Sequence, residues 1–312
     1  MNTAPRQTSD PRRNQLLAAL SDADRERWRS RLEPVDLRFG QVLCESGSAP
    51  AHVYFPTTAV VSLLYRTQDG ASTEIAVVGN DGVVGISLFM GGNATPSEAV
   101  VQSAGLGYRL SAQAVDDEVR RAGPVLGTLL RYTQAMIAQV AQTAMCNRYH
   151  SIDQQLARRL LVGLDRSPSD DLAMTQEGVA NLLGVRREGV TAAALKLQQA
   201  GVIRYRRGHI AVLDRRLLEQ RTCECYAVAK REYERLLPMP ITARFDAVGV
   251  ARPSRGGAAP GLRAPTETTF DGRGIFGPRG ASQLPENPLG QRREFPDRVA
   301  AAPRPPALAG QL

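Results

Sequence analysis

The sequence has few of the residues that usually build metal sites, disulfide frameworks or membrane spans. Its 312 residues include only four cysteines, and its three histidines, His52, His150 and His209, stand far apart. Four scattered cysteines in a chain of this length indicate reduced thiols. The longest stretch without a charged residue, 46–65, contains two prolines and is a poor membrane span. The first residues lack the apolar segment of a signal peptide. We therefore expect a cytoplasmic protein with no metal, no cofactor and no membrane contact.

The sequence also lacks the short motifs that are typical of enzymes. It has no glycine loop of the kind that cradles phosphates, no nucleophile elbow, and no paired histidine and carboxylate motif. Aromatic residues make up only 5% of the chain. We therefore predict no catalytic residues and no enzymatic activity.

The charge is unevenly distributed along the chain. Its 39 basic and 31 acidic residues give a net charge of +8. Residues 1–174 hold 17 basic and 18 acidic side chains, 175–235 hold 12 and 7, and 236–312 hold 10 and 6. A neutral first half followed by a basic second half indicates a domain or a tail that meets a polyanion.

The last part of the chain, 238–312, has the composition of a disordered tail. It contains 12 of the 20 prolines and 10 of the 28 glycines. Such a segment cannot bury enough apolar area to offset its conformational entropy. We expect a solvated extension there, and its arginines add at most a weak affinity for polyanions.

The first half predicts a small antiparallel barrel behind a helical lead-in over residues 14–32. Short runs rich in Val, Tyr and Phe alternate with glycine, proline and Asn-Asp-Gly turn signals. About eight short strands with tight turns argue for a barrel or jelly roll. The clearest candidates are Val35–Phe39, His52–Phe55, Val60–Arg66, Thr73–Val78 and Ala99–Ser103.

Two helices are expected after the barrel. Ser111 can cap a short helix that ends at Arg121, and Pro124 suits the first turn of a longer one that extends to about Tyr149. The long helix carries apolar or small residues at heptad spacing, which is typical of a helix that pairs with its own copy. The alternative is that this stripe packs on its own barrel, with Leu129, Met136 and Met145 as a second apolar edge. The predicted dimer seam consists of Leu126, Leu130, Thr133, Ile137, Val140 and Ala144. A capping box at Ser151 and Gln154 starts the next helix.

The strongest signal lies in residues 175–213. Thr175 can cap a helix that runs to Leu183, Gly184 permits a tight turn, and a second helix follows from about Arg186 to Ala200. The small Ala180 suits a close crossing of the two helices. Gly201 then leads into two alternating segments, 202–205 and 209–213, around Arg206-Arg207-Gly208. A helix-turn-helix followed by a basic hairpin is a winged helix.

Basic residues concentrate in this winged helix. Eight lysines and arginines between residues 186 and 216 face only two acidic residues. Cations placed on phosphates give affinity and a steep salt dependence, and the start of the second helix enters the major groove. The predicted DNA-binding residues are Thr175, Gln176, Arg186, Arg187, Glu188, Thr191, Lys196, Arg204, Arg206, Arg207 and His209.

At this point the sequence resembles the Crp/Fnr family of bacterial transcription regulators over residues 15–235. The resemblance is carried by Thr175-Gln176-Glu177, by Ala180 with Leu183-Gly184-Val185, by Arg187-Glu188, and by Gly201-Val202-Ile203. It implies a homodimer that binds palindromic double-stranded DNA, contacts RNA polymerase, and responds to a ligand in a cyclic-nucleotide-binding-type barrel.

The sequence departs from the cyclic AMP-binding pattern of that family. Those members have a glutamate after a glycine for the ribose hydroxyl and an arginine before Ser-Ala for the cyclic phosphate. Here Ile86 and not a glutamate follows Gly85, and Pro96 and not an arginine precedes Ser97, in the stretch Thr95-Pro96-Ser97-Glu98-Ala99. A buried cyclic phosphate without a cation is poorly compensated. The corresponding effector pocket, Gly85, Ile86, Ser87, Ser97 and Ala99, is therefore expected to take a ligand other than cyclic AMP, or none.

A second departure from the family pattern lies in the recognition helix, the second helix of the helix-turn-helix. The family often places an arginine four residues after the glutamate, where this chain has Ala192, so the preferred base differs.

Cys223 and Cys225 at i and i+2 of a helix would point about 200° apart, which favours structural cysteines over a metal pair. The single cysteine before the long helix, Cys44, disfavours an iron–sulfur cluster.

Together these observations predict an α+β protein. The expected domains are a barrel sensor over 14–122, a dimerisation helix over 123–149, a winged helix-turn-helix over 150–237, and the tail over 238–312. The predicted function is sequence-specific transcription regulation under an unidentified effector. The alternative is a small-molecule receptor that signals through protein partners, with the winged helix as a docking surface.

Overall fold

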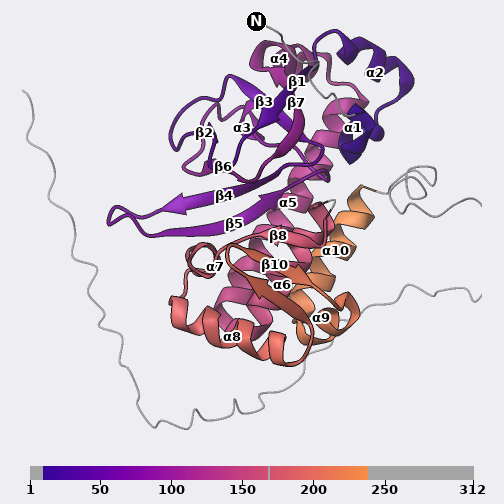
Figure 1. The fold of residues 1–312 in the computed structure, drawn as a ribbon. Coiled ribbons are helices and arrows are strands. Elements are labelled where there is room, and N and C mark those ends of the chain that lie inside the picture. The colour runs from indigo at the N-terminus through magenta and orange to yellow at the C-terminus, as the bar shows by residue number, and fades with distance from the viewer. Residues whose placement is uncertain (1–9, 168, 238–312) are drawn as a thin grey trace, which may run out of the picture. The chain divides into compact units, whose positions relative to one another are not determined.

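The structure, a computed structural model, describes residues 10–167 and 169–237 (Figure 1). The predicted tail, 238–312, lies outside the described residues. The described part starts with a short 3-10 helix, Pro11–Arg13, followed by α1 (Gln15–Ala18) and α2 (Asp22–Arg29). The Asn14 side chain caps α1 and donates hydrogen bonds to the carbonyl oxygens of Pro56 and Gly82, at 2.9 and 2.8 Å. This buried amide ties the first helices to the sheets.

Seven strands form two antiparallel sheets in the first half of the chain, which confirms the predicted antiparallel barrel. One sheet has the order β1-β7-β3, with β1 Glu33–Leu37, β7 Gly105–Ser111 and β3 His52–Pro56. The other has the order β2-β6-β4-β5, with β2 Val42–Cys44, β6 Glu98–Ser103, β4 Val60–Arg66 and β5 Ser72–Val78.

The seven strands are one fewer than the roughly eight expected, and outside them an isolated bridge joins Tyr54 to Val84. The two backbones exchange hydrogen bonds of 3.0 and 2.8 Å there. Gly85 adopts a φ of +97°, which turns the chain away from the sheet directly after the bridge. The chain then enters the short helix α3, Ser87–Met90.

The space between the sheets is filled by apolar side chains. Val53, Phe55, Val61, Val78 and Leu110 are each at most 1% exposed. The only tryptophan, Trp28, packs at 5.8 Å from Phe55, measured between ring centroids, so α2 contributes to the same core. This burial supplies most of the stability of the barrel.

Three helices connect the barrel to the C-terminal part. They are α4 (Ala112–Arg121), α5 (Pro124–Tyr149) and α6 (Ile152–Arg166). Ser111 caps α4, Pro124 occupies the first turn of α5, and Ser151 with Gln154 forms the expected capping box of α6. No helix in the described part of the chain is long and apolar enough to span a bilayer.

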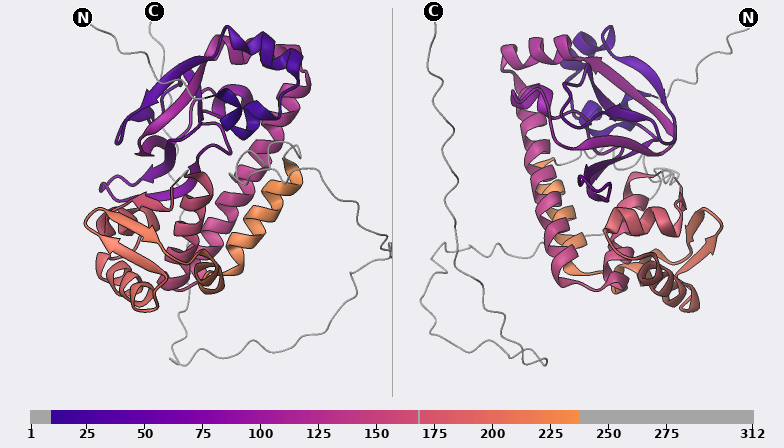
Figure 2. Two further views of the ribbon diagram at one scale, coloured as in Figure 1. Left: turned by 45° about the vertical axis from the view of Figure 1, so that its right-hand side comes forward. Right: turned by 90° about the vertical axis from the view of Figure 1, so that its left-hand side faces the viewer.

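The C-terminal elements form a second core around α6. They are β8 (Asp171–Ala173), α7 (Gln176–Leu183), α8 (Arg187–Gln199), β9 (Ile203–Arg206), β10 (His209–Val212), α9 (Arg215–Arg221) and α10 (Glu224–Leu236). The expected hairpin, β9 with β10, gains β8 as an unpredicted third strand, in the order β8-β10-β9. Helix α10 runs back along α5 (Figure 2). All described residues belong to one compact unit.

Candidate nucleic-acid interface

The turn between α7 and α8 is fixed by a glycine in the left-handed region. Gly184 has a φ of +65°, and the amide of Val185 donates to the carbonyl oxygen of Ala180 at 3.0 Å. Ala180 is 3% exposed, so a small side chain lies where the two helices cross. Val190, Ala194 and Leu197 of α8 are buried against this pair. These buried contacts orient α8 so that its opposite face is exposed to solvent.

The first residues of α8 are exposed and carry the predicted base contacts. Arg186 is the N-cap residue but makes no side-chain cap, and Arg187 and Glu188 begin the helix. Within the described residues, none of these three side chains forms an ion pair. They are therefore available to base edges, where arginine pairs with guanine and glutamate accepts from cytosine.

A second group of predicted residues joins the two helices. Thr175 caps α7, with its Oγ1 2.9 Å from the amide nitrogen of Gly178. Thr191 Oγ1 lies 2.9 Å from Gln176 Oε1 and 3.0 Å from the carbonyl oxygen of Arg187. The structure thus brings Gln176, Thr191 and the start of α8 together on one exposed surface.

The wing supplies further cations. Arg204, Arg206 and Arg207 are exposed on β9 and its turn, and no ion pair of theirs occurs among the residues described. Gly208, with a φ of +80°, closes the turn. Free guanidinium groups at the tip of a β-hairpin suit contacts with phosphates.

Two other residues predicted to contact DNA lie close to carboxylates of the same chain. Lys196 Nζ lies 2.7 Å from the carboxylate of Asp153 in α6, and His209 Nδ1 lies 3.5 Å from that of Asp171 in β8. Each acidic partner is exposed and reduces the positive potential near it. Sequence spacing could not show these pairs, because both partners come from elements outside the helix-turn-helix.

Arg215 in α9 has a structural role. Arg215 donates to Asp165 and to the hydroxyl of Tyr226, and it pairs with Glu219 at 3.0 Å. Burial disfavours its charge, but the Asp165 carboxylate outweighs this and raises the pKa of Arg215. Its charge therefore holds α6, α9 and α10 together and adds little to a DNA surface.

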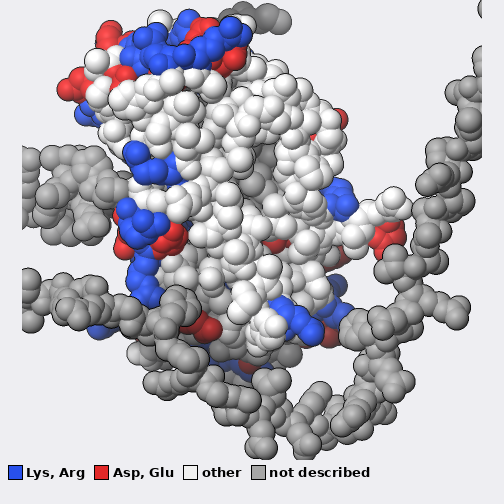
Figure 3. All heavy atoms as spheres, turned by 180° about the vertical axis from the view of Figure 1, so that it is seen from behind, with Lys and Arg blue, Asp and Glu red and all other residues white. Residues whose placement is uncertain are grey.

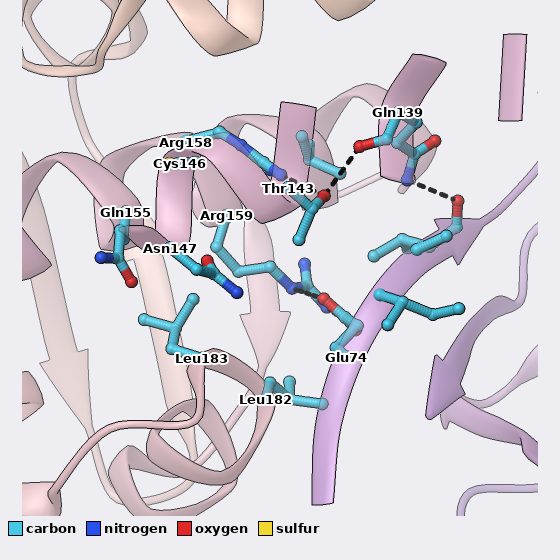
Figure 4. Close-up of a pocket in the computed structure, with 14 residues that line it drawn as sticks. Glu74, Gln139, Thr143, Cys146, Asn147, Gln155, Arg158, Arg159, Leu182 and Leu183 are labelled. Carbon is cyan, nitrogen blue, oxygen red and sulfur yellow. Dashed lines mark hydrogen bonds and ion pairs between the residues drawn. The ribbon is translucent and has the colours of Figure 1, made fainter. Parts of the chain in front are cut away.

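The barrel and the C-terminal part, which contains α6 and the helix-turn-helix, meet at a buried ion pair beside a small pocket. Arg159 of α6 places its Nε 2.5 Å from Glu74 Oε1 in β5, and both side chains are about 5% exposed (Figure 4). Ser62 and Gln102 complete the cluster. Helix α7 packs on β5, and Thr73 donates to the carbonyl oxygen of Leu182 at 3.4 Å. No local sequence pattern predicts this contact.

A second ion pair crosses the same boundary. Arg166 at the end of α6 lies 2.7 Å from Asp81, which follows β5, and it also donates to Gln139 of α5. Burial opposes its charge, yet Asp81 keeps the pKa of Arg166 raised. Helix α6 is thus fastened to the barrel at two points.

The expected effector residues are positioned by the barrel, but no cation accompanies them. Ser87, Ser97 and Ala99 are buried, and Ser97 Oγ lies 3.0 Å from Thr95 Oγ1. Residues 33–111 contain three basic side chains, Arg38, Arg66 and Arg109, and none of them is buried. Arg66 pairs with Glu98 and Arg109 with Glu33 at the surface.

The predicted dimer seam of α5 is divided between two faces. Leu130 is 48% exposed and Ile137 60%, and Ala144 is exposed beside them, whereas Leu126 and Val140 are half-buried. Thr133 is 4% exposed and donates to the carbonyl oxygen of Leu129, so it faces the interior. The helix carries only two charged residues, and the molecule seen from behind shows a broad uncharged area in its middle (Figure 3).

The prediction that Cys223 and Cys225 point in opposite directions is wrong. Cys223 is the N-cap residue, with extended φ and ψ of −85° and 167°, and only Cys225 lies in α10. Both thiols therefore turn to the same side, toward Cys146 and His150 at the end of α5. Burial raises the pKa of Cys146 to about 12, against the positive charge of Arg158, and that of Cys225 to about 11.

Comparisons with known proteins agree with this architecture. The cyclic nucleotide-binding domain family matches residues 34–122, and the Crp-like helix-turn-helix domain family matches residues 154–221. No curated protein matches the sequence.

Solved structures share the fold at low identity. A putative regulator of the Crp/Fnr family from Eubacterium rectale has a TM-score of 0.54 at 17% identity, covering 67% of this chain and 98% of its own. FixK2 from Bradyrhizobium japonicum has a TM-score of 0.52 at 17% identity, covering 62% and 98%. A putative cAMP-binding regulatory protein from Silicibacter pomeroyi has a TM-score of 0.50 at 16% identity, covering 67% and 95%.

A cyclic-nucleotide-binding-type barrel, a long connecting helix and a winged helix-turn-helix define a class of transcription regulators. The matches are to transcription regulators and not to enzymes. The two matched domains, in this order along the chain, identify it as a regulator of the Crp/Fnr type.

Proposed function

We propose that the protein is a homodimeric, sequence-specific transcription regulator that binds palindromic DNA with α8 and the wing. The observation that carries the proposal is the group of unpaired, exposed side chains at the start of α8 and on the wing. Arg186, Arg187 and Glu188 serve direct recognition, and Arg206 and Arg207 contact phosphates. In the cell this activity belongs to the cytoplasm and involves RNA polymerase.

Dimerisation is supported by the exposed apolar stripe of α5. Leu130, Ile137 and Ala144 are spaced at heptad intervals and face solvent in the single chain. Pairing of this stripe with its copy would bury it and relate the two recognition helices by a two-fold axis. Half-sites about 34 Å apart, one turn of DNA, would follow from this arrangement.

Control by the barrel is supported by the two ion pairs that join α6 to it. A change near β5 would be transmitted through Glu74 to Arg159, and through Asp81 to Arg166. Because α6 packs against α8, a shift of α6 reorients the recognition helix. The absence of a buried cation among residues 33–111 argues that the effector is not a cyclic nucleotide.

DNA binding is tested by fluorescence anisotropy with a selected operator and a scrambled duplex. Arg187→Ala should remove most discrimination between the two duplexes, a loss of about 1–3 kcal/mol. Arg206→Ala should weaken both about equally and reduce the salt slope by about one. Arg38→Ala, in the barrel, is the matched control.

The proposal is refuted if the wild-type protein shows no preference for any duplex at moderate salt after selection from a random DNA pool. An acidic protein partner that binds the same surface, while DNA does not, would favour the docking alternative. Calorimetric titration with cyclic AMP should give no binding. Tight binding of cyclic AMP would refute the argument about the effector.

A further inference from the structure

Four metal-binding side chains meet where α5 ends and α10 begins. Cys146 lies in the last turn of α5, His150 follows at its C-cap, and Cys223 and Cys225 lie at the start of α10. Their ligand atoms all lie within 4.8 Å of one another. The three thiols are at most 4% exposed, and the imidazole is 15% exposed. We propose that these four residues bind one zinc ion in a closed Cys3His site.

The distances agree with the edges of a zinc tetrahedron. Zinc–sulfur bonds of about 2.3 Å and zinc–nitrogen bonds of about 2.05 Å give edges of about 3.8 Å between two sulfurs and about 3.6 Å between sulfur and nitrogen. Cys146 Sγ lies 3.5 Å from Cys223 Sγ, and Cys225 Sγ lies 3.5 Å from His150 Nδ1. The three cysteines are free thiols, and both distances agree with the spacing of two ligands on one zinc ion.

The surroundings of the histidine select the nitrogen that faces the cluster. His150 Nε2 lies 3.3 Å from the Glu224 carboxylate, which leaves Nδ1 directed at Cys225. A carboxylate on the other ring nitrogen is the usual partner of a metal-bound histidine. The carbonyl oxygen of His150 also accepts a hydrogen bond from Gln155 at 2.9 Å, which holds the residue in place.

A bound zinc ion would supply the positive charge that buried thiolates need. Three thiolates and one zinc ion leave a single negative charge. Burial opposes the thiolate form of Cys146 and Cys225, and the Glu224 carboxylate also opposes it at Cys225. Arg158 and the N-terminus of α10, which has no side-chain cap, act in the opposite direction. When zinc binds, each cysteine ligand loses its proton to solvent.

A bound zinc ion would join the end of α5 to the start of α10 beside the capping box of α6. Three of its four ligands are thiolates and the fourth is an imidazole, so no position stays open for catalysis. The site would therefore fix the turn between the long helix and the DNA-binding part. The proposal does not depend on DNA binding and can be tested without it.

The test measures the zinc content of the full chain. The protein is purified anaerobically without a polyhistidine tag, dialysed, and analysed by mass spectrometry for metals. We expect about one zinc per chain for wild type and for the control Cys44→Ser, whose thiol lies in β2 of the barrel. We expect less than about a tenth of this for the double variant Cys223→Ser/Cys225→Ser. Equal zinc in both variants, or none in wild type after reconstitution, would overturn the proposal.

Two further measurements keep the test decisive if the double variant does not fold. Cobalt(II) added to wild-type apoprotein should give thiolate charge-transfer bands and the strong visible bands of tetrahedral coordination, while an octahedral spectrum overturns the site. Glu224→Gln should weaken zinc affinity at least about 10-fold, with Glu234→Gln unchanged. Isolation of a Cys146–Cys223 disulfide or of an iron–sulfur chromophore, in place of zinc, would also overturn the proposal.

Discussion

Replacement of Glu74 by glutamine should test how strongly the buried ion pair holds the DNA-binding part to the barrel. Glu74 and Arg159 are 6% and 5% exposed, and the carboxylate is the only anion that approaches Arg159 within the described part of the chain. Glu74→Gln keeps the shape of the side chain but leaves the buried guanidinium without a counter-charge. Removal of one partner from such a pair costs about 3–5 kcal/mol.

The size of this effect can be compared with that of an exposed pair. Arg235 lies 2.6 Å from Glu232 in α10, with side chains 60% and 29% exposed. Exposed pairs contribute about 0.2–1 kcal/mol, so Glu232→Gln should be nearly neutral. A loss of 3–5 kcal/mol in a domain of this size lowers the melting temperature by about 6–20 °C, which is readily measured.

The assay combines two spectroscopic probes of urea unfolding. Trp28 is the only tryptophan and lies in the barrel core, so its fluorescence reports on the barrel. Far-ultraviolet circular dichroism reports mainly on the helices. Since the pair joins two cores, the helical signal of Glu74→Gln should be lost at a lower urea concentration than the fluorescence signal, and the free energy of unfolding is then taken from the helical transition alone.

A double variant separates the loss of the counter-charge from the loss of packing. Glu74→Met/Arg159→Met removes both charges and fills the site with apolar atoms, and it should recover most of the stability lost in Glu74→Gln. The reasoning is refuted if Glu74→Gln lowers the free energy of unfolding by less than about 1 kcal/mol, the loss expected for Glu232→Gln. It is also refuted if the loss in the double variant equals the sum of the losses in Glu74→Met and Arg159→Met.

Three further predictions concern the long helix, the turn and the barrel. Ile137→Glu should weaken dimerisation at least about 30-fold by sedimentation, with Thr128→Glu on the opposite face of the same helix as control, and an unchanged dimer would refute the seam. Gly184→Ala should destabilise the protein by about 1–2 kcal/mol because the φ of Gly184 is positive. Gly127→Ala inside α5 should stabilise the protein by about 0.5–1 kcal/mol. Equal melting curves for the two variants would contradict this prediction. Burial, and then Arg109, lowers the pKa of His52, so the unfolded chain takes up the proton first. Stability should therefore be full above pH 6.5 and fall below it, and His52→Gln should show a smaller fall in melting temperature between pH 7 and 5.

The sequence by itself determined the elements whose signals are local. Ser111, Pro124, Thr175 and Gly184 each start or end a helix where the sequence predicted it, because caps and positive φ angles depend on a few neighbouring atoms. The winged helix followed from the same kind of signal. Of the strands, β2, β7 and β8 are not among the named candidates. Strands β2 and β8 have only three residues each, and β7 contains two glycines, so little alternation is left to detect.

Tertiary structure alone decided which distant side chains meet. Arg159 and Glu74 are 85 residues apart, and Cys146 and Cys223 are 77 residues apart, so no local pattern could pair them. The partner of Lys196 and the inward face of Thr133 have the same origin, because each depends on how one helix packs against another. A heptad pattern shows that a helix has an apolar stripe, but only packing shows which part of the stripe stays exposed.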